Sequence, residues 1–120
     1  MVYLITGKAG AGKTHYGNEL AKELRAEGFN VRRFDGDVFR KQTNNTDFTD
    51  KGRISNLMNV AKLAHEYELC GDVVILSFIA PRKEWRDRMR AMWNESRVIY
   101  IPGGTLWDGT IYEKPTKDEN

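Results

Sequence analysis

The sequence predicts an α/β fold, with a short parallel sheet of about four strands between layers of helices. Apolar runs of about five residues alternate with longer segments of helical periodicity, as in parallel strands joined by crossover helices. A glycine-rich octet stands between the first apolar run and the first helical segment. A loop at that place lies at the carboxyl edge of the sheet, where ligands bind in open α/β folds.

The first half of the chain contains two predicted strands and two predicted helices. Val2–Thr6 is an apolar run typical of a buried strand, and residues 13–27 carry apolar residues at four-residue spacing before Gly28. Val31–Asp35 is the second predicted strand. Residues 38–49 are mostly polar and are expected to form an exposed connection. Residues 50–68 then show a stripe of apolar residues at helical spacing: Ile54, Leu57, Met58, Ala61 and Ala64.

The second half repeats the alternation. Residues 73–79 form the most hydrophobic run, which predicts a central strand. Pro81 is expected to start a helix that continues to about residue 93, and residues 97–101 form a fourth predicted strand. The Pro-Gly-Gly triplet at 102–104 ends it, so residues 102–120 are expected to be a short C-terminal extension of one domain, residues 1–120.

Composition narrows the class of protein. Hydrophobic residues make up 40% of the 120 residues and charged residues 30%, which is typical of a globular chain. The net charge of +2 fits phosphate-rich ligands and nucleic acid equally well. Cys70 is the only cysteine, so neither an internal disulfide nor a cysteine-rich metal site is expected. With no apparent signal peptide or membrane span, we expect a cytoplasmic protein, of a cell or of an infected host.

The octet reads G-x-x-x-x-G-K-[ST], which is the phosphate-binding loop (P-loop) of nucleoside triphosphate enzymes. It consists of Gly7, Lys8, Ala9, Gly10, Ala11, Gly12, Lys13 and Thr14. Backbone amides of such a loop and the following helix N-terminus bind phosphate oxygens. Lys13 is expected to reach the β- and γ-phosphates, and the Thr14 hydroxyl to ligate Mg²⁺. The sequence therefore predicts a three-layer α/β/α fold of the P-loop NTPase type that uses ATP and Mg²⁺.

Acidic residues separate the classes of P-loop protein. Motor ATPases and switch GTPases place a Mg²⁺-linked aspartate at a strand tip, but the third predicted strand ends Leu-Ser-Phe. No Asn-Lys-x-Asp guanine-reading motif occurs either. The acid stands instead at the end of the second strand, in Asp35-Gly36-Asp37. A carboxylate there can accept the proton of an attacking hydroxyl, which favours a kinase with Lys13 and Asp35 as catalytic residues. Arg40 is close enough in sequence to reach an anionic acceptor.

These residues resemble the adenylylsulfate kinase family, a group of minimal nucleotide-kinase-like P-loop enzymes. Asp35-Gly36-Asp37 with Arg40 is similar to that family's Asp-Gly-Asp-x-x-Arg motif, and residues 48–56 are similar to its Phe-Ser-x-x-Asp-Arg-x-x-Asn segment. Residues 77–81 resemble its Ser-Phe-Ile-Ser-Pro, and Tyr112-Glu113-Lys114-Pro115 its Tyr-Glu-x-Pro. The resemblance implies transfer of the ATP γ-phosphate to the 3′-hydroxyl of adenosine 5′-phosphosulfate.

The resemblance also implies which residues bind the acceptor. Phe48 and Phe78 match two phenylalanines that hold its adenine, and stacking on an aromatic face contributes ~1–3 kcal/mol per base. Arg53 and Asn56 share a helix face, expected to point away from the apolar stripe, and match a pair used on the acceptor nucleotide. The full acceptor set implied is Asp37, Arg40, Phe48, Arg53, Asn56, Phe78 and Ile79.

The chain departs from the family at three places. Met58 and Asn59 stand where the family carries two arginines, and Gly52 replaces an aspartate. We expect that the family's basic lid between the fourth strand and the Tyr-Glu-x-Pro segment is missing, together with a last strand and helix. A lid excludes water from a reacting phosphate, so something else is expected to cover this site.

Three explanations remain open: a partner subunit in a homo-oligomer, a minimal kinase that tolerates hydrolysis, or a polymer acceptor. Some bacteriophage P-loop kinases phosphorylate 5-hydroxymethyluracil in DNA, and the chain is similar to them in kind. Basic residues and tryptophans after Pro81 are candidate DNA contacts: Arg82, Lys83, Arg86, Arg88, Arg90, Trp85, Trp93 and Trp107. The alternative is that the basic residues form a solvated helix face and the tryptophans belong to the core. A rival of another class is a catalytically inactive nucleotide-binding protein. No membrane partner is expected.

Overall fold

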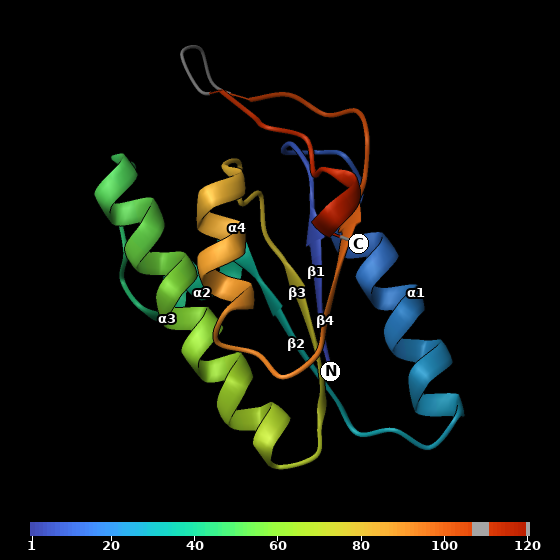
Figure 1. The fold of residues 1–120 in the computed structure, drawn as a ribbon. Coiled ribbons are helices and arrows are strands. Elements are labelled where there is room, and N and C mark those ends of the chain that lie inside the picture. Colours follow the sequence, from blue (N-terminus) through green and yellow to red (C-terminus); the bar gives the residue numbers. More distant parts are fainter. Residues whose placement is uncertain (107–110, 120) are drawn as a thin grey trace.

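The computed structural model describes residues 1–106 and 111–119 (Figure 1). Its elements in chain order are β1 (Val2–Thr6), α1 (Lys13–Ala26), β2 (Val31–Asp35), α2 (Gly36–Gln42), α3 (Asp50–Leu69), β3 (Val73–Ser77), α4 (Lys83–Arg90), β4 (Ser96–Tyr100) and the 3₁₀ turn η1 (Lys117–Glu119). The four strands form one parallel sheet in the order β2-β3-β1-β4. This confirms the predicted sheet and the inner position of the third strand.

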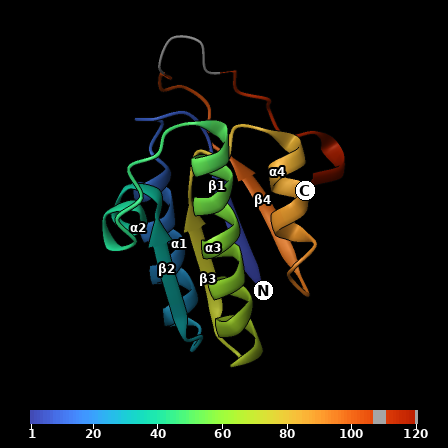
Figure 2. The same cartoon turned by 90° about the vertical axis from the view of Figure 1, so that its left-hand side faces the viewer.

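Helices cover both faces of the sheet, which confirms the three-layer fold. α1 lies on one face, and α3 and α4 lie together on the other, as Figures 1 and 2 show from two directions. Alternation along β1 sends Val2 and Leu4 into the core under α3 and α4, and Ile5 into the core under α1. A strand buried on both faces must be largely apolar, which is why the inner strands β1 and β3 appear as apolar runs, whereas the edge strands β2 and β4 carry arginines.

The segment after β2 corrects one expectation. Residues 38–49 were expected to form an exposed connection, but α2 occupies 36–42 and buries Phe39 to 6% exposure. The Phe39 ring packs edge-on against Phe34 and Phe78, with ring centroids 6.3 and 6.1 Å apart. One buried aromatic in a seven-residue helix leaves no periodic pattern for the sequence to show.

Two other boundaries differ from expectation. β3 ends at Ser77, two residues early, because the chain leaves the sheet through Ala80, whose φ is +42°. α4 begins at Lys83 after Arg82, which has an extended backbone, and ends at Arg90. The parallel register places Asp35 opposite Ser77 at the carboxyl edge, beside the loop that follows β1. Within the described residues, no helix is both long and apolar enough to cross a membrane.

Candidate active site

The octet forms the predicted strand–loop–helix turn. Gly12 caps the N-terminus of α1 with φ +102°, a left-handed conformation that side chains disfavour. α1 then starts at Lys13, so its unpaired N-terminal amides and positive dipole end lie at the loop. This arrangement suits a phosphate group.

The Lys13 side chain folds back over the loop. Its Nζ donates a hydrogen bond of 2.7 Å to the carbonyl oxygen of Lys8. Burial lowers the pKa of Lys13 below its usual value, and the negative charge of Asp37 partly opposes that shift. The ammonium is therefore partly desolvated and would interact strongly with an incoming phosphate.

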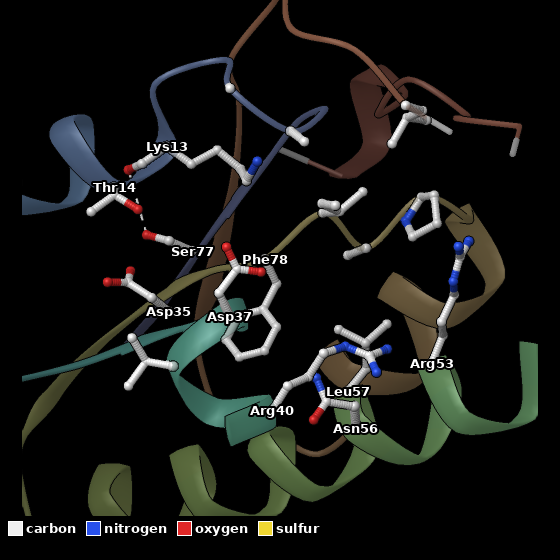
Figure 3. Close-up of a pocket in the computed structure, with 18 of the residues that line it drawn as sticks. Lys13, Thr14, Asp35, Asp37, Arg40, Arg53, Asn56, Leu57, Ser77 and Phe78 are labelled. Atoms are coloured by element: carbon white, nitrogen blue, oxygen red, sulfur yellow. Dashed lines mark hydrogen bonds between the residues drawn. The ribbon is translucent and has the colours of Figure 1, made fainter. Parts of the chain in front are cut away.

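A cavity of about 740 Å³ opens beside the loop (Figure 3), which is within the usual range for small-molecule sites. It is lined by Ala9, Gly10, Gly12, Lys13, Thr14, Asp35, Gly36, Asp37, Val38, Arg40, Phe48, Arg53, Asn56, Leu57, Ser77, Phe78, Ile79, Ala80, Pro81 and Leu106. All seven residues implied for the acceptor line it, together with Lys13, Thr14 and Asp35. Residues 7, 8 and 11 of the octet do not line it.

Asp35 and Asp37 lie on opposite sides of the α2 N-terminus. Asp35 occupies the N-cap position, yet its side chain makes no cap hydrogen bond, and its Oδ1 is buried without a partner among residues 1–106 and 111–119. Figure 3 draws its carboxylate on the side of Thr14 and Ser77, whereas that of Asp37 points toward Lys13. An aspartate at this position usually caps its helix, so Asp35 is left available to a ligand.

The two phenylalanines of the acceptor set differ in environment. Phe78 is 3% exposed and packs on Phe39, whereas Phe48 is 49% exposed at the cavity. The Arg40 guanidinium lies over the Phe48 ring at 4.7 Å from its centroid. Burial and the neighbouring charge of Arg53 lower the pKa of Arg40, while Asp47 and Asp37 raise it. An aromatic face with a cation beside it suits a base attached to an anionic group.

The side chain of Asn56 on α3 is oriented differently from the expectation. Its side chain was expected to point away from the apolar stripe, but it is 4% exposed and lines the cavity with Leu57, a member of that stripe. Within the part of the chain that the structure describes, its Oδ1 is buried without a hydrogen-bond partner. Asn56 therefore lies at the boundary between the core and the cavity, and Arg53 lines the same wall.

Sequence reasoning missed several lining residues. Ser77 lies opposite Asp35 in the sheet, and its hydroxyl donates a 3.5 Å hydrogen bond to the carbonyl oxygen of Lys13. The strand register is the signal that could have identified it. Leu57 was assigned to the core, and Leu106 had no signal because it approaches from beyond β4.

Several of the candidate DNA contacts are buried in the structure. Arg86 is fully buried and pairs with Glu119, so it is not a surface cation. Trp85 and Trp93 are 4% and 7% exposed, and the Trp93 indole donates to the carbonyl oxygen of Ala61 at 3.0 Å. These two tryptophans are core residues, and Trp107 lies outside the described residues.

The described residues contain no cluster of three or more His, Cys, Asp or Glu that could hold a metal ion. Two oxygen groups suited to Mg²⁺ nevertheless belong to residues that line the cavity: the Thr14 hydroxyl and the carboxylate of Asp35. Mg²⁺ usually keeps several waters and binds through one or two protein groups plus substrate phosphates. These residues therefore fit a magnesium ion that arrives with a nucleotide.

Comparison with known proteins identifies the family of the chain. The family model described as adenylylsulphate kinase matches residues 1–102. The adenylyl-sulfate kinase of Bacillus licheniformis is 36% identical over 100 residues, which cover 81% of this chain and 51% of that protein. A probable adenylyl-sulfate kinase of Archaeoglobus fulgidus is 37% identical over 90 residues, covering 74% and 58%. The chain thus spans about half the length of the curated relatives it matches.

Solved structures show the same fold. The hexameric APS kinase of Thiobacillus denitrificans is 27% identical with a TM-score of 0.80, covering 95% of this chain and 23% of that one. The Mycobacterium tuberculosis APS kinase in complex with AMPPNP and APS has a TM-score of 0.78 at 23% identity, covering 84% and 61%. From its phosphate loop, its parallel sheet and the match over residues 1–102, this chain belongs to the adenylylsulphate kinase family.

Proposed function

We propose that the chain transfers the γ-phosphate of ATP to a hydroxyl group of a nucleotide-type acceptor, with adenylyl sulfate as the first candidate. The observation that carries the proposal is a single cavity lined by both the phosphate loop and the acceptor residues. Relatives named adenylyl-sulfate kinases, and a solved relative bound to AMPPNP and APS, support this choice of substrates.

On the ATP side, the loop amides and Lys13 would bind the triphosphate. Lys13 would exchange its bond to the Lys8 carbonyl for phosphate oxygens. The Thr14 hydroxyl, with Asp35 through water, would hold Mg²⁺, which supplies positive charge to the phosphates. Since phosphoryl transfer requires mainly positioning and charge neutralisation, these groups supply most of what the reaction needs.

On the acceptor side, Asp35 would orient the attacking hydroxyl and accept its proton. The acceptor oxygen forms a bond to the γ-phosphorus, the bond from that phosphorus to the β,γ-bridging oxygen breaks, and ADP leaves with the electron pair. Phe48 and Phe78 would hold the base. Arg40, Arg53 and Asn56, with Asp37 and the wall at Ile79, would contact the sugar and its anionic group.

The test offers γ-labelled ATP together with adenylyl sulfate, free nucleosides or DNA containing hydroxymethylated pyrimidines. Label on adenylyl sulfate supports the proposal. Label on DNA alone would show that the acceptor is a base in a polymer. Triphosphate binding without label on any acceptor would favour a catalytically inactive nucleotide-binding protein.

A homo-oligomer is a further part of the proposal, supported by the hexameric relative. Mass in solution, followed together with turnover on dilution, tests it. Turnover per chain that stays constant while the assembly dissociates would show that one subunit suffices.

A further inference from the structure

The chain beyond β4 lies against the phosphate loop. Residues 101–106 leave the sheet edge and run alongside the loop that follows β1 (Figure 1). The family match ends at residue 102, so most of this segment lies outside it. We refer to residues 101–106 as the clasp.

Backbone hydrogen bonds join the clasp to the residue before the loop and to the first half of the loop. The Ile101 amide donates to the carbonyl oxygen of Thr6 at 2.9 Å, directly before the octet. The Thr105 amide donates to the carbonyl oxygen of Ala9 at 2.9 Å, and these two residues form an isolated antiparallel bridge. The first half of the octet is therefore held against a second chain segment.

Two glycines make this approach possible. A Cβ atom on Gly104 would overlap the carbonyl oxygen of Ala9 and lie 3.0 Å from the Ala11 nitrogen. A Cβ atom on Gly7 would lie 2.5 Å from the carbonyl oxygen of Ile101. Backbone therefore packs on backbone along the contact, with no space for a side chain between the segments.

The clasp also reaches the cavity. Leu106 lines it together with Ala9 and Gly10 of the loop. The clasp thus contributes the apolar side chain of Leu106 to the space where a ligand would lie.

We propose that the clasp holds the phosphate loop in the conformation that receives a nucleoside triphosphate, with Gly104 as a positioning residue. The inference rests on the proposed function, because it takes a triphosphate to be the ligand. Glycine-rich loops lose much conformational entropy when they become ordered. A loop already ordered by its neighbour does not incur that loss on binding, and affinity rises accordingly.

Gly104→Ala tests the inference, and Gly103→Ala is its matched control. Both glycines have positive φ, +73° and +92°, so both substitutions strain the backbone. A Cβ atom on Gly103 would meet nothing within 4 Å, whereas one on Gly104 meets the loop. Calorimetric titration with ATP and AMPPNP should show at least a tenfold weaker Kd for Gly104→Ala relative to Gly103→Ala.

Two readouts separate positioning from general damage. Amide hydrogen exchange at residues 8–12 should accelerate in Gly104→Ala only, while the KM of the acceptor at saturating ATP should stay within twofold. Thr105→Pro, which removes the amide that bonds Ala9, is a second variant should Gly104→Ala fail to fold, with at least a threefold loss of ATP affinity expected. If ATP affinity and amide exchange were both unchanged in these variants, the proposed role of the clasp would be wrong, but the proposed function would stand. A wild-type chain that binds no triphosphate would overturn the proposed function as well.

Discussion

Two side-chain oxygens at the cavity, Asp35 Oδ1 and Asn56 Oδ1, are buried without a hydrogen-bond partner in the described part of the chain. Leaving a buried acceptor unpaired costs about 1–3 kcal/mol. A ligand with hydroxyl or amine donors could form hydrogen bonds with both oxygens and remove that cost. At the scale of single residues, the cavity wall is therefore more polar than folding alone requires.

Asp35→Asn is expected to reduce phosphoryl transfer by a factor of about 10²–10⁴ while ATP affinity stays within about threefold, because the amide cannot accept the acceptor proton. Single-turnover transfer and a separate ATP titration measure the two effects. Asp37→Asn is the matched comparison, since its carboxylate lines the same cavity on the side of Lys13. A larger loss of transfer in Asp37→Asn would move the role of base to Asp37.

Lys13→Ala is expected to abolish measurable transfer and to weaken ATP binding at least tenfold, because it removes the partly buried ammonium at the loop. Lys22→Ala on the same helix, whose side chain is 66% exposed, removes the same charge without touching the cavity and should bind ATP normally. ATP titration of both variants checks this. Equal affinities would show that the loop amides alone determine ATP binding.

The sequence could predict which residues line the site better than how they are placed there. Motif spacing identified Lys13 and Asp35, and the family resemblance implied the acceptor set; all of these residues line one cavity. Ser77 and Leu106 were missed because strand register or a long-range contact brings them there. The expected direction of Asn56 was wrong because helical periodicity gives a face but not its neighbours.

At the scale of elements, the bounds of β2 were predicted to the residue, although Arg32 and Arg33 interrupt its apolar residues. α2 could not be predicted, because tertiary packing of Phe39 on Phe34 and Phe78 stabilises it. α4 begins two residues later than expected: the chain at Arg82 is still extended, and Pro81 belongs to the cavity wall.

Glu68 joins the end of α3 to the chain that enters β4. Its carboxylate is 3% exposed and accepts the backbone amides of Asn94 at 2.9 Å and Glu95 at 3.2 Å. Burial alone would raise the pKa of Glu68, but these two amides and His65 lower it overall. The ionised form is thus more stable in the folded chain than in the unfolded one.

Glu68→Gln is expected to lower the free energy of unfolding by about 1–3 kcal/mol at pH 7, because hydrogen bonds to a charged acceptor are lost. Since the folded pKa lies below the ordinary 4.5, the stabilisation is complete above pH 4.5 and is lost as pH falls through the folded pKa. Urea unfolding from pH 7 to pH 3 should show the two proteins converging in acid. Glu66→Gln, on the exposed side of α3, is the control, and a pH-independent difference would contradict the prediction.

At the scale of the whole molecule, residues 111–119 return to the body of the protein and contact both sides of the site. The Tyr112 hydroxyl lies 2.7 Å from that of Thr6, which precedes the phosphate loop and donates to the carbonyl oxygen of Ile79. The Glu113 amide donates to the carbonyl oxygen of Pro81 at 2.7 Å. The sequence indicated this segment only through a motif match, because its partners Thr6 and Pro81 lie far from it in the sequence.

A buried ion pair anchors the same tail. Arg86 Nε donates to Glu119 at 2.8 Å, and its other nitrogens donate to the carbonyl oxygens of Ala80 and Glu113. Both side chains are fully buried. Arg86 therefore connects α4, the cavity wall at Ala80 and the tail, a role that a basic run in the sequence could not reveal.

Glu119→Ala is expected to lower the free energy of unfolding by about 3–5 kcal/mol, because it leaves the Arg86 guanidinium buried without its counter-charge. Asp118→Ala is the matched control: the adjacent carboxylate, 72% exposed, pairs with Lys83 at 3.4 Å, and its loss should change stability far less than Glu119→Ala does. Replacing both partners, Arg86→Met with Glu119→Met, should recover much of the stability, since no unpaired charge remains. Urea unfolding of the four proteins measures these differences, and limited proteolysis should cleave the tail faster in Glu119→Ala. Equal stability of Glu119→Ala and Asp118→Ala would show that the tail is not anchored through Arg86.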